Sequence, residues 1–245
     1  MSIRVAVVGA TGRLGSQVAA VVESMPDMEL VARLDSRSEL ADMLGADVAV
    51  DVTLPGVSKT VVEFAISQGI SVLVGTSGWS ADRLTELRTL IGKTPGATAF
   101  VVPNFSLGST VQMMVAKQAA QYFESIEIVE AHHASKVDSP SGTAVRTAEE
   151  LAEVRSGLGG VIAPHVNQSA RGEQIQGIPV HSLRLAGVVA KQDVLFGGVG
   201  ETLTISHSTT SRDAYTAGIA LALRFLANSS GLTIGLEHAL VAPTS

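Results

Sequence analysis

The densest group of chemically capable side chains lies in the middle of the chain, in the segment EAHHASKVDSPSGTA that begins at Glu130. Two adjacent histidines, His132 and His133, are followed by Lys136, and the sequence SGT closes the segment at 141–143. Histidine exchanges protons near neutral pH, and lysine supplies a positive charge or a proton. This combination suits proton transfer during the reduction of an anionic substrate. The alternative is that the histidines are structural groups at a strand end.

The SGT sequence has two interpretations. Ser141 and Thr143 stand where a helix is expected to begin, so their hydroxyls and the nearby backbone N–H groups can cap that helix or bind a carboxylate. Taken alone, such residues are more often caps. Because Lys136 and two histidines lie within a few residues, we favour an anionic ligand and count Gly142 in its binding site.

A metal site is not expected at the paired histidines. Adjacent side chains in extended backbone point to opposite sides, so His132 and His133 cannot readily chelate one ion. The chain also has no cysteine, which excludes thiolate zinc sites, disulfides and a cysteine nucleophile. The remaining histidines are expected to have surface or structural roles: His165, His181, His207 and His238.

A second candidate site lies near the start of the chain, where GATGRLG follows a short aliphatic run. Gly9, Gly12 and Gly15 give the spacing GxxGxxG, a variant of the GxGxxG loop that binds dinucleotides. Their missing Cβ atoms let the backbone approach a pyrophosphate, and the helix start favours its negative charge. A plain strand-to-helix turn is the alternative. Asp35 favours the binding interpretation, because it ends the second expected strand, where a carboxylate can accept hydrogen bonds from an adenosine ribose.

The choice of cofactor depends on three charged residues. Asp35 repels a ribose 2′-phosphate and therefore favours NADH, whereas Arg13 and Arg37 can pair with that phosphate and favour NADPH. Asp35 could instead be a turn residue, and the arginines could be solvated surface charges. We expect NADH and NADPH both to be used, with a modest advantage for NADH.

Two further segments follow expected strands, GTSG at 75–78 and VPNF at 102–105. The carboxyl ends of parallel strands meet at one edge of a sheet, where open α/β sheets bind ligands. Ordinary turns are the alternative for both segments. The candidate cofactor-binding residues are Gly9, Ala10, Thr11, Gly12, Arg13, Leu14, Asp35, Gly75, Thr76, Ser77, Val102, Pro103, Asn104 and Phe105.

A fold of alternating strands and helices is expected to position the first site. Short β-branched runs predict strands at 4–8, 29–34, 48–52, 70–74 and 98–102, and helical spacing appears at 14–24, 58–68 and 80–91. This rhythm is typical of a Rossmann-like parallel sheet. Hydrophobic residues form 46% of the 245 residues and aromatic residues only 4%, which suits aliphatic strands covered on both faces.

After Pro103 the rhythm changes, and a second unit is expected. Helical stretches are predicted at 107–123 and 143–154, strands at 126–130, 180–185, 188–196 and 202–207, a loop at 156–177, and a last helix at 215–226. Leu203 and Ile205 alternate with polar residues, which indicates an antiparallel or mixed sheet.

The charge and hydropathy of the chain limit its partners. A net charge of −6 gives no broad footprint for nucleic acid or an anionic membrane. Arg224 interrupts the most apolar stretch, so no run approaches the roughly 18 residues of a spanning helix. The first apolar stretch, 5–8, is too short for a secretory signal. We therefore expect a cytoplasmic protein with a small-molecule substrate and without nucleic acid or membrane partners.

Segments along nearly the whole chain resemble the 4-hydroxy-tetrahydrodipicolinate reductase family, also called dihydrodipicolinate reductases. They are VVGATGRLG, GTSG, VPNFS, EAHHASKVDSPSGTA, IPVHSLRLAG and GETLTISH. The histidine segment is the specific part, since the glycine loop fits many dehydrogenases. Two departures are small: GTSG replaces the commoner GTTG, and Gln192 stands where many relatives have histidine.

The resemblance implies the NAD(P)H-dependent reduction of 4-hydroxy-tetrahydrodipicolinate with loss of water, in bacterial diaminopimelate and lysine synthesis. It implies a dinucleotide-binding domain at 1–105 with 214–245, and an α+β domain with a mixed sheet at 106–213 for substrate binding and homotetramer assembly. His132 would be the proton donor or acceptor and Lys136 a proton donor and carboxylate partner. His133 would bind substrate, and Gly142 with Thr143 would hold a substrate carboxylate.

Two rival functions are weighed against this one. Another small Rossmann dehydrogenase, such as one acting on an amino-acid aldehyde, would lack the HHxxK sequence. A regulatory protein could bind NAD(P) without turnover, and the oxidation of reduced cofactor in the presence of substrate would separate it from an enzyme.

Overall fold

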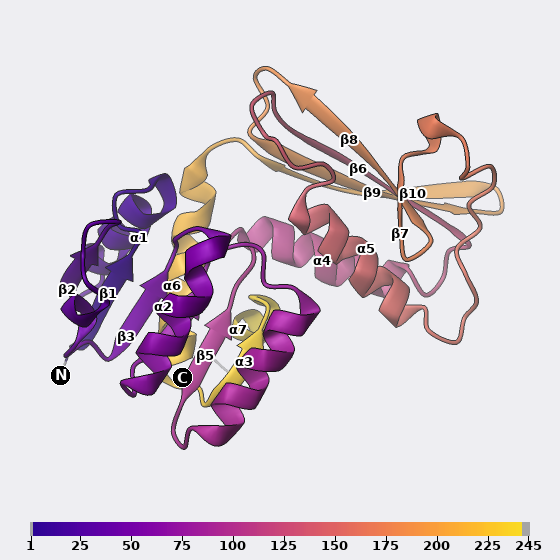
Figure 1. The fold of residues 1–245 in the computed structure, drawn as a ribbon. Coiled ribbons are helices and arrows are strands. Elements are labelled where there is room, and N and C mark those ends of the chain that lie inside the picture. The colour runs from indigo at the N-terminus through magenta and orange to yellow at the C-terminus, as the bar shows by residue number, and fades with distance from the viewer. Residues whose placement is uncertain (1, 242–245) are drawn as a thin grey trace. The chain divides into compact units, whose positions relative to one another are not determined.

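The computed structural model describes residues 2–241, which divide into two compact units (Figure 1). Unit 1 runs to Leu107 and resumes at Tyr215, and unit 2 is Gly108–Ala214. Among the described residues, no helix is long and apolar enough to cross a membrane.

Unit 1 is built on a six-stranded sheet with the order β11-β5-β4-β3-β1-β2, in which every neighbouring pair is parallel. Its strands are β1 (Ile3–Val8), β2 (Met28–Leu34), β3 (Val48–Asp51), β4 (Ser71–Val74), β5 (Thr98–Val101) and β11 (Gly231–Ile234). Its helices are α1 (Arg13–Ser24), α2 (Pro55–Ser67), α3 (Ala81–Lys93), α6 (Thr216–Ala227) and α7 (Glu237–Val241), with a 3-10 turn at Leu40–Met43.

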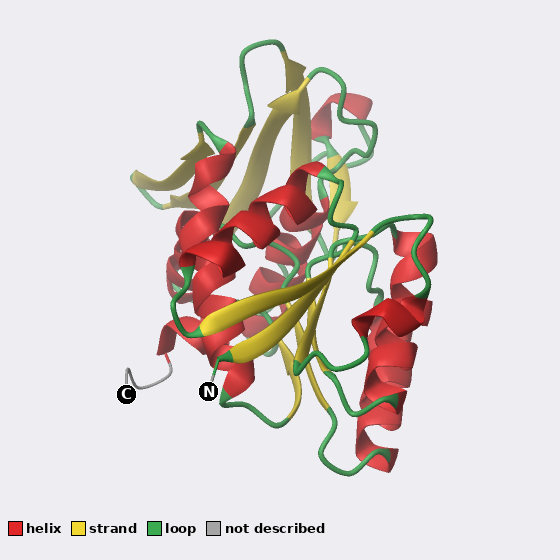
Figure 2. Cartoon of the chain, turned by 90° about the vertical axis from the view of Figure 1, so that its left-hand side faces the viewer, coloured by secondary structure: helices red, strands yellow, loops and turns green. Residues whose placement is uncertain are grey.

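Helices cover both faces of this sheet (Figure 2), which is why its strands read as continuous aliphatic runs. On β1, Val5 and Val7 pack with α1 and α6, whereas Ala6 and Val8 pack with α2 and α3. Successive side chains thus enter opposite cores, as the two-residue period of a strand requires. The predicted Rossmann-like parallel sheet is confirmed.

Unit 2 contains a five-stranded mixed sheet with the order β10-β9-β6-β8-β7, in which β6 and β8 are parallel and the other pairs antiparallel. Its strands are β6 (Ser125–His133), β7 (Glu173–Ile175), β8 (Ile178–Leu185), β9 (Ala190–Gly198) and β10 (Glu201–Thr209). Its helices are α4 (Leu107–Ala119) and α5 (Gly142–Val154), with 3-10 turns at Ser169–Arg171 and Arg212–Tyr215. The predicted mixed sheet is confirmed.

Helices α4 and α5 lie on the same side of the unit 2 sheet (Figure 1). The core between them includes Ile126 and Ile128 of β6, Phe196 of β9, and Ala148 and Leu151 of α5, all of which are buried. Side chains at alternate positions of the same strands point to the opposite face. Leucines on that face remain substantially exposed: Leu183, Leu185 and Leu195.

Several elements differ from the sequence predictions. Strand β11 and helix α7 were not predicted, because each has only four or five residues and is held by the rest of unit 1. Strand β7 falls inside the expected loop at 156–177, where it hydrogen-bonds along β8 at the sheet edge.

Several boundaries also differ from the predictions, among them the ends of α4 and β6. Helix α4 ends at Ala119 rather than 123, and Arg155 donates hydrogen bonds to the carbonyls of Ala120 and Phe123 in the turn that follows. Strand β6 continues past 130 to His133, because β8 pairs with it as far as that residue and β9 as far as His132.

Candidate active site

The β1–α1 turn of unit 1 requires glycine at two positions. Gly9 has a φ of +90°, and a Cβ there would lie 2.6 Å from the carbonyl oxygen of Val52. A Cβ on Gly15 would lie 2.0 Å from the carbonyl oxygen of Gly9. Contacts this short are sterically forbidden, so the glycines allow the strand and the helix to meet in a tight turn.

This turn has the features of a pyrophosphate site. Helix α1 begins at Arg13 after Gly12, and in the described chain no side chain caps its N-terminus. The sheet order also reverses at β1, which has β2 on one side and β3 on the other. Dinucleotides bind at such switch points, with the pyrophosphate at the helix start.

Asp35 lies directly after β2 and is bound to Arg37. Its carboxylate accepts hydrogen bonds from the backbone N–H of Arg37 at 2.8 Å and from the guanidinium at 3.2 Å. These bonds hold the pKa of Asp35 below its ordinary value. A carboxylate held by hydrogen bonds and an 88% exposed arginine side chain therefore lie together at the end of β2, where an adenosine ribose would bind.

The GTSG and VPNF segments meet in the structure, as predicted for the carboxyl edge of the sheet. A Cβ on Gly75 would lie 2.6 Å from the ring of Phe105, so glycine makes room for the aromatic side chain. The buried hydroxyl of Thr76 donates to the carbonyl of Asp51 at 3.3 Å. The side-chain oxygen of Asn104 accepts from the N–H two residues on at 2.9 Å, which shapes the start of α4.

Asp51, which the sequence analysis did not single out, is fully buried at the end of β3. It accepts hydrogen bonds from the hydroxyl of Thr53 at 2.6 Å and from the hydroxyl of Ser58, and the indole of Trp79 donates to Ser58 at 2.9 Å. This network fixes the β3–α2 turn, whose Val52 carbonyl touches the glycine loop. The sequence held one signal that could have identified Asp51: an acidic residue at the end of an aliphatic strand.

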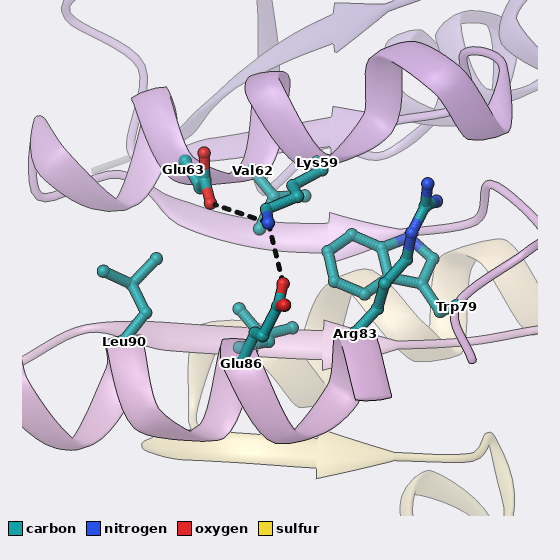
Figure 3. Close-up of a pocket in the computed structure, with 8 residues that line it drawn as sticks. Lys59, Val62, Glu63, Trp79, Arg83, Glu86 and Leu90 are labelled. Carbon is teal, nitrogen blue, oxygen red and sulfur yellow. Dashed lines mark hydrogen bonds and ion pairs between the residues drawn. The ribbon is translucent and has the colours of Figure 1, made fainter. Parts of the chain in front are cut away.

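Unit 1 also has a small pocket between α2 and α3, separate from the glycine turn (Figure 3). Lys59 bonds Glu86 at 2.7 Å and approaches Glu63 at 3.8 Å there, and Trp79 and Arg83 close one end. Its volume of about 20 Å³ holds about one water molecule. The pocket is therefore too small for a cofactor.

In unit 2, His132 lies near the end of β6 with its ring against a buried carboxylate. The ring nitrogen Nδ1 is 2.6 Å from Oε2 of Glu130, whose exposed fraction is zero. Burial lowers the pKa of His132, and the charge of Glu130 opposes part of this decrease. Burial would raise the pKa of Glu130, but the polar groups of Ser182, His132 and Arg184 hold it below its ordinary value.

Glu130 has two further partners from distant parts of unit 2. The guanidinium of Arg184 on β8 lies 3.0 Å from both carboxylate oxygens, and the backbone N–H of Ser141 donates to one of them at 3.3 Å. Arg184 also donates to the carbonyl of Asp138. Neither Glu130 nor Arg184 was a sequence candidate, because the resemblance drew attention to the histidines and the lysine.

The turn after β6 brings the remaining candidates together. Lys136 contacts both carboxylate oxygens of Asp138, and its backbone N–H donates to the carbonyl of His133 at 3.1 Å. The ring of His133 bonds the hydroxyl of Ser135 at 2.9 Å. The two histidine rings thus have different partners, as expected for adjacent strand residues.

The N-terminus of α5 combines a cap with an open position. The hydroxyl of Ser141 accepts from the N–H of Ala144 at 3.2 Å, so this side chain caps the helix. A Cβ on Gly142 would meet no described atom within 4 Å. Gly142 and Thr143 therefore stand at a positive helix end with space beside them for a carboxylate.

Gln192 stands where many members of the resembled family have histidine. It is buried, and its side chain makes polar contacts between β9 and two helices. Its amide nitrogen donates to Thr147 of α5 at 3.1 Å and to Gln112 of α4 at 3.3 Å. The amide of Gln112 in turn bonds the carbonyls of Gln192 and Ile205. These contacts join α4 and α5 to the sheet.

No group of three or more histidine, cysteine, aspartate or glutamate side chains is placed to hold a metal ion within residues 2–241.

Comparison with known proteins gives matches to both units. The family model for the N-terminus of dihydrodipicolinate reductase matches residues 3–105, and that for the C-terminus matches residues 108–240. A 4-hydroxy-tetrahydrodipicolinate reductase from Clavibacter sepedonicus is 57% identical over 238 residues, covering 97% of this chain and 86% of the relative. One from Streptomyces coelicolor is 44% identical over 245 residues, covering 97% and 98%.

Solved structures agree with these matches. A dipicolinate-bound dihydrodipicolinate reductase from Paenisporosarcina sp. TG-14 has a TM-score of 0.80 at 30% identity, over 97% of this chain and 99% of that one. A scyllo-inositol dehydrogenase from Lactobacillus casei with bound NAD(H) has a TM-score of 0.62 at 13% identity, over 98% and 93%. The latter shares the fold alone.

Proposed function

The chain belongs to the dihydrodipicolinate reductase family, and from this premise we propose that unit 1 binds the cofactor and unit 2 the substrate. The chain is an NAD(P)H-dependent oxidoreductase that reduces 4-hydroxy-tetrahydrodipicolinate, a step in diaminopimelate and lysine biosynthesis. The resemblance seen in the sequence is thereby confirmed.

The cofactor site we propose is the carboxyl edge of the unit 1 sheet. The N–H groups at the start of α1 would hold the pyrophosphate, since glycine at positions 9 and 15 allows β1 and α1 to meet in the tight turn that carries them. Asp35 would accept from the adenosine ribose, and the segments at 75–77 and 102–105 would line the rest of the site. When bound, the reduced nicotinamide supplies a hydride to the substrate.

The substrate site we propose lies around the turn after β6. The dicarboxylate would place one carboxylate at the N–H groups of Gly142 and Thr143, where the helix end favours negative charge. Lys136 and His133 would contact its polar groups. The solved dihydrodipicolinate reductase from Paenisporosarcina sp. TG-14 is bound to dipicolinate, a dicarboxylate, which supports a site of this chemistry.

His132 and Lys136 would donate the protons that the reaction requires. In the loss of water the leaving hydroxyl gains a proton and the ring gives one up, and hydride addition then leaves an electron-rich ring that must gain one proton. An imidazolium and an ammonium group are both proton donors, and the carboxylate of Glu130 stabilises the imidazolium form of His132. By fixing the substrate beside these donors, the turn after β6 would supply the orientation that lowers the barrier.

The observation that carries this proposal is the clustering of His132, Lys136 and the N-terminus of α5 around one turn. An assay that supplies freshly made substrate from the preceding synthase, with NADH and NADPH in parallel, tests it. Consumption of reduced cofactor that depends on substrate is expected. Cofactor binding without consumption would instead indicate a nucleotide-sensing protein.

We further propose that the enzyme is a cytoplasmic homotetramer assembled through the open face of the unit 2 sheet. Leu183, Leu185 and Leu195 are 45%, 48% and 38% exposed on that face, and apolar side chains gathered on one surface favour an interface. Light scattering should give four times the 25.3 kDa chain mass, and Leu195→Lys should reduce it. A monomeric wild type would refute the tetramer.

A further inference from the structure

We propose that Glu130 is a positioning residue of the reaction: its buried carboxylate fixes the tautomer and orientation of His132 and, with Arg184, holds the substrate-binding segments together. This inference rests on the proposed role of His132 as a proton donor. Neither the sequence motif nor the comparisons give Glu130 or Arg184 a role.

The placement of the two side chains follows from the strand. Glu130 and His132 are two residues apart on β6 and so project from the same face, toward α5. Their side chains meet at 2.6 Å, and the fully buried carboxylate has no freedom to leave the ring. Arg184 is the residue of β8 that pairs with His132 of β6, and its guanidinium contacts the Glu130 carboxylate from that neighbouring strand.

The hydrogen bond determines which nitrogen of His132 exchanges protons. A carboxylate only accepts, so Nδ1 must carry a proton. Nε2 is then the atom left for proton exchange with substrate. The same carboxylate stabilises the imidazolium form that a proton donor needs, as in other carboxylate–histidine pairs.

The other charges around His132 oppose its imidazolium form, so that form depends on Glu130. Lys136 in the following turn and Arg184 on β8 are positive, and both lower the pKa of His132 in addition to burial. Asp138 is negative, but its carboxylate is bound to Lys136. Glu130 therefore provides the negative charge in direct contact with the ring.

Glu130 and Arg184 also tie the surrounding segments to the sheet. Glu130 accepts from the N–H of Ser141 at 3.3 Å, which fixes the residue that precedes Gly142. Arg184 reaches the carbonyl of Asp138, in the turn that carries Lys136. One buried ion pair thus contacts the proton donor, the lysine turn and the start of α5.

The variant Glu130→Gln tests the proposal, because it keeps the shape of the side chain and removes its charge. We expect kcat to fall by about 10-fold or more, with NADH binding unchanged. We also expect the pH at which activity is lost on the alkaline side to move lower by about one unit, since imidazolium loses its counter-charge. An unchanged pH profile would overturn the proposal.

Glu127→Gln is the matched control. Glu127 is on the same strand and also pairs with an arginine and a histidine, Arg171 and His181. It is an odd number of residues from Glu130, so its side chain lies on the opposite face of the sheet from His132. We expect it to leave the pH profile of kcat in place. An equal shift in both variants would show a general electrostatic effect and would contradict a specific role of Glu130.

Two measurements keep the test decisive. If Glu130→Gln does not fold, nitrogen NMR of wild-type His132 decides: a neutral ring protonated on Nδ1 is expected, and one protonated on Nε2 would refute the inference. The variant His132→Ala separates the two hypotheses. Full activity in that variant would refute the proposed role of His132 itself, whereas an inactive His132→Ala beside a normal Glu130→Gln would refute only the inference.

Discussion

Lys136 and Asp138 form an ion pair in which the ammonium group contacts both carboxylate oxygens at 2.7 Å. The lysine side chain is only 20% exposed, so the pair fixes its position in the turn after β6. The hydrogen bonds from Lys136 hold the pKa of Asp138 below its ordinary value, although burial opposes this. A substrate carboxylate that binds Lys136 must therefore share the ammonium group with Asp138.

Removing either proposed proton donor should impair turnover without loss of cofactor binding. We expect Lys136→Ala and His132→Ala each to lower kcat by about 10²-fold or more, since each removes a positioned donor. Both residues lie in unit 2, so NADH affinity should remain near that of the wild type. Steady-state kinetics with fluorescence titration of NADH measures both quantities. Near-normal kcat in a folded variant would remove that residue from the mechanism.

The variant Gly142→Ala should weaken substrate binding and leave the fold intact. A methyl group there meets no described protein atom within 4 Å, so it would occupy space that we assign to a substrate carboxylate. We expect KM to rise by about 10-fold, with little change in kcat or Tm.

Gly160→Ala is the control for this variant, because its added Cβ also meets no described atom within 4 Å. It lies in the loop at 156–177 and should keep the wild-type KM. If Gly142→Ala also keeps it, the start of α5 is a plain helix cap.

Asp35→Ala should change the choice between cofactors. The carboxylate accepts hydrogen bonds from Arg37, and its loss would free that arginine for a ribose 2′-phosphate. We expect kcat/KM with NADH to fall by about 10-fold and with NADPH to stay constant or improve. An equal decrease with both cofactors would mean that Asp35 supports the loop and does not bind the ribose. A wild-type enzyme that strongly prefers NADPH would show that the arginines outweigh the carboxylate.

Gly15→Ala should destabilise unit 1 and weaken cofactor binding together. Its Cβ would overlap the carbonyl of Gly9, and relieving that overlap requires a backbone shift that costs about 1–3 kcal/mol. Tm should fall, and the Kd for NADH should rise as the pyrophosphate turn opens.

Gly92→Ala in α3 is the matched helical substitution, because a Cβ there meets no described atom within 4 Å. It should stabilise the protein by about 0.5–1 kcal/mol, through the helix propensity of alanine. A Tm of Gly15→Ala equal to the wild type would show that the turn relaxes without cost.

Much of unit 1 could be predicted because its signals are local. The buried strands of the parallel sheet carry short apolar runs, as in AVV of β1, and glycine follows β1 and β4 directly. The site segments were found for the same reason, since each comes directly after such a strand. Strand β11 has no such pattern, because its four residues lie at the sheet edge and are all only partly buried.

The sequence by itself determined the glycine turn, the parallel sheet and the identity of the residues around His132, because these depend on residue types close together in the chain. The tertiary structure decided which of the two histidines faces a buried carboxylate, since only the pairing of β6 with its neighbours sets that face. It also brought Arg184 to Glu130 across 54 residues. Hydrogen bonds and charges between distant segments act only after the chain has folded, so sequence spacing could not reveal them.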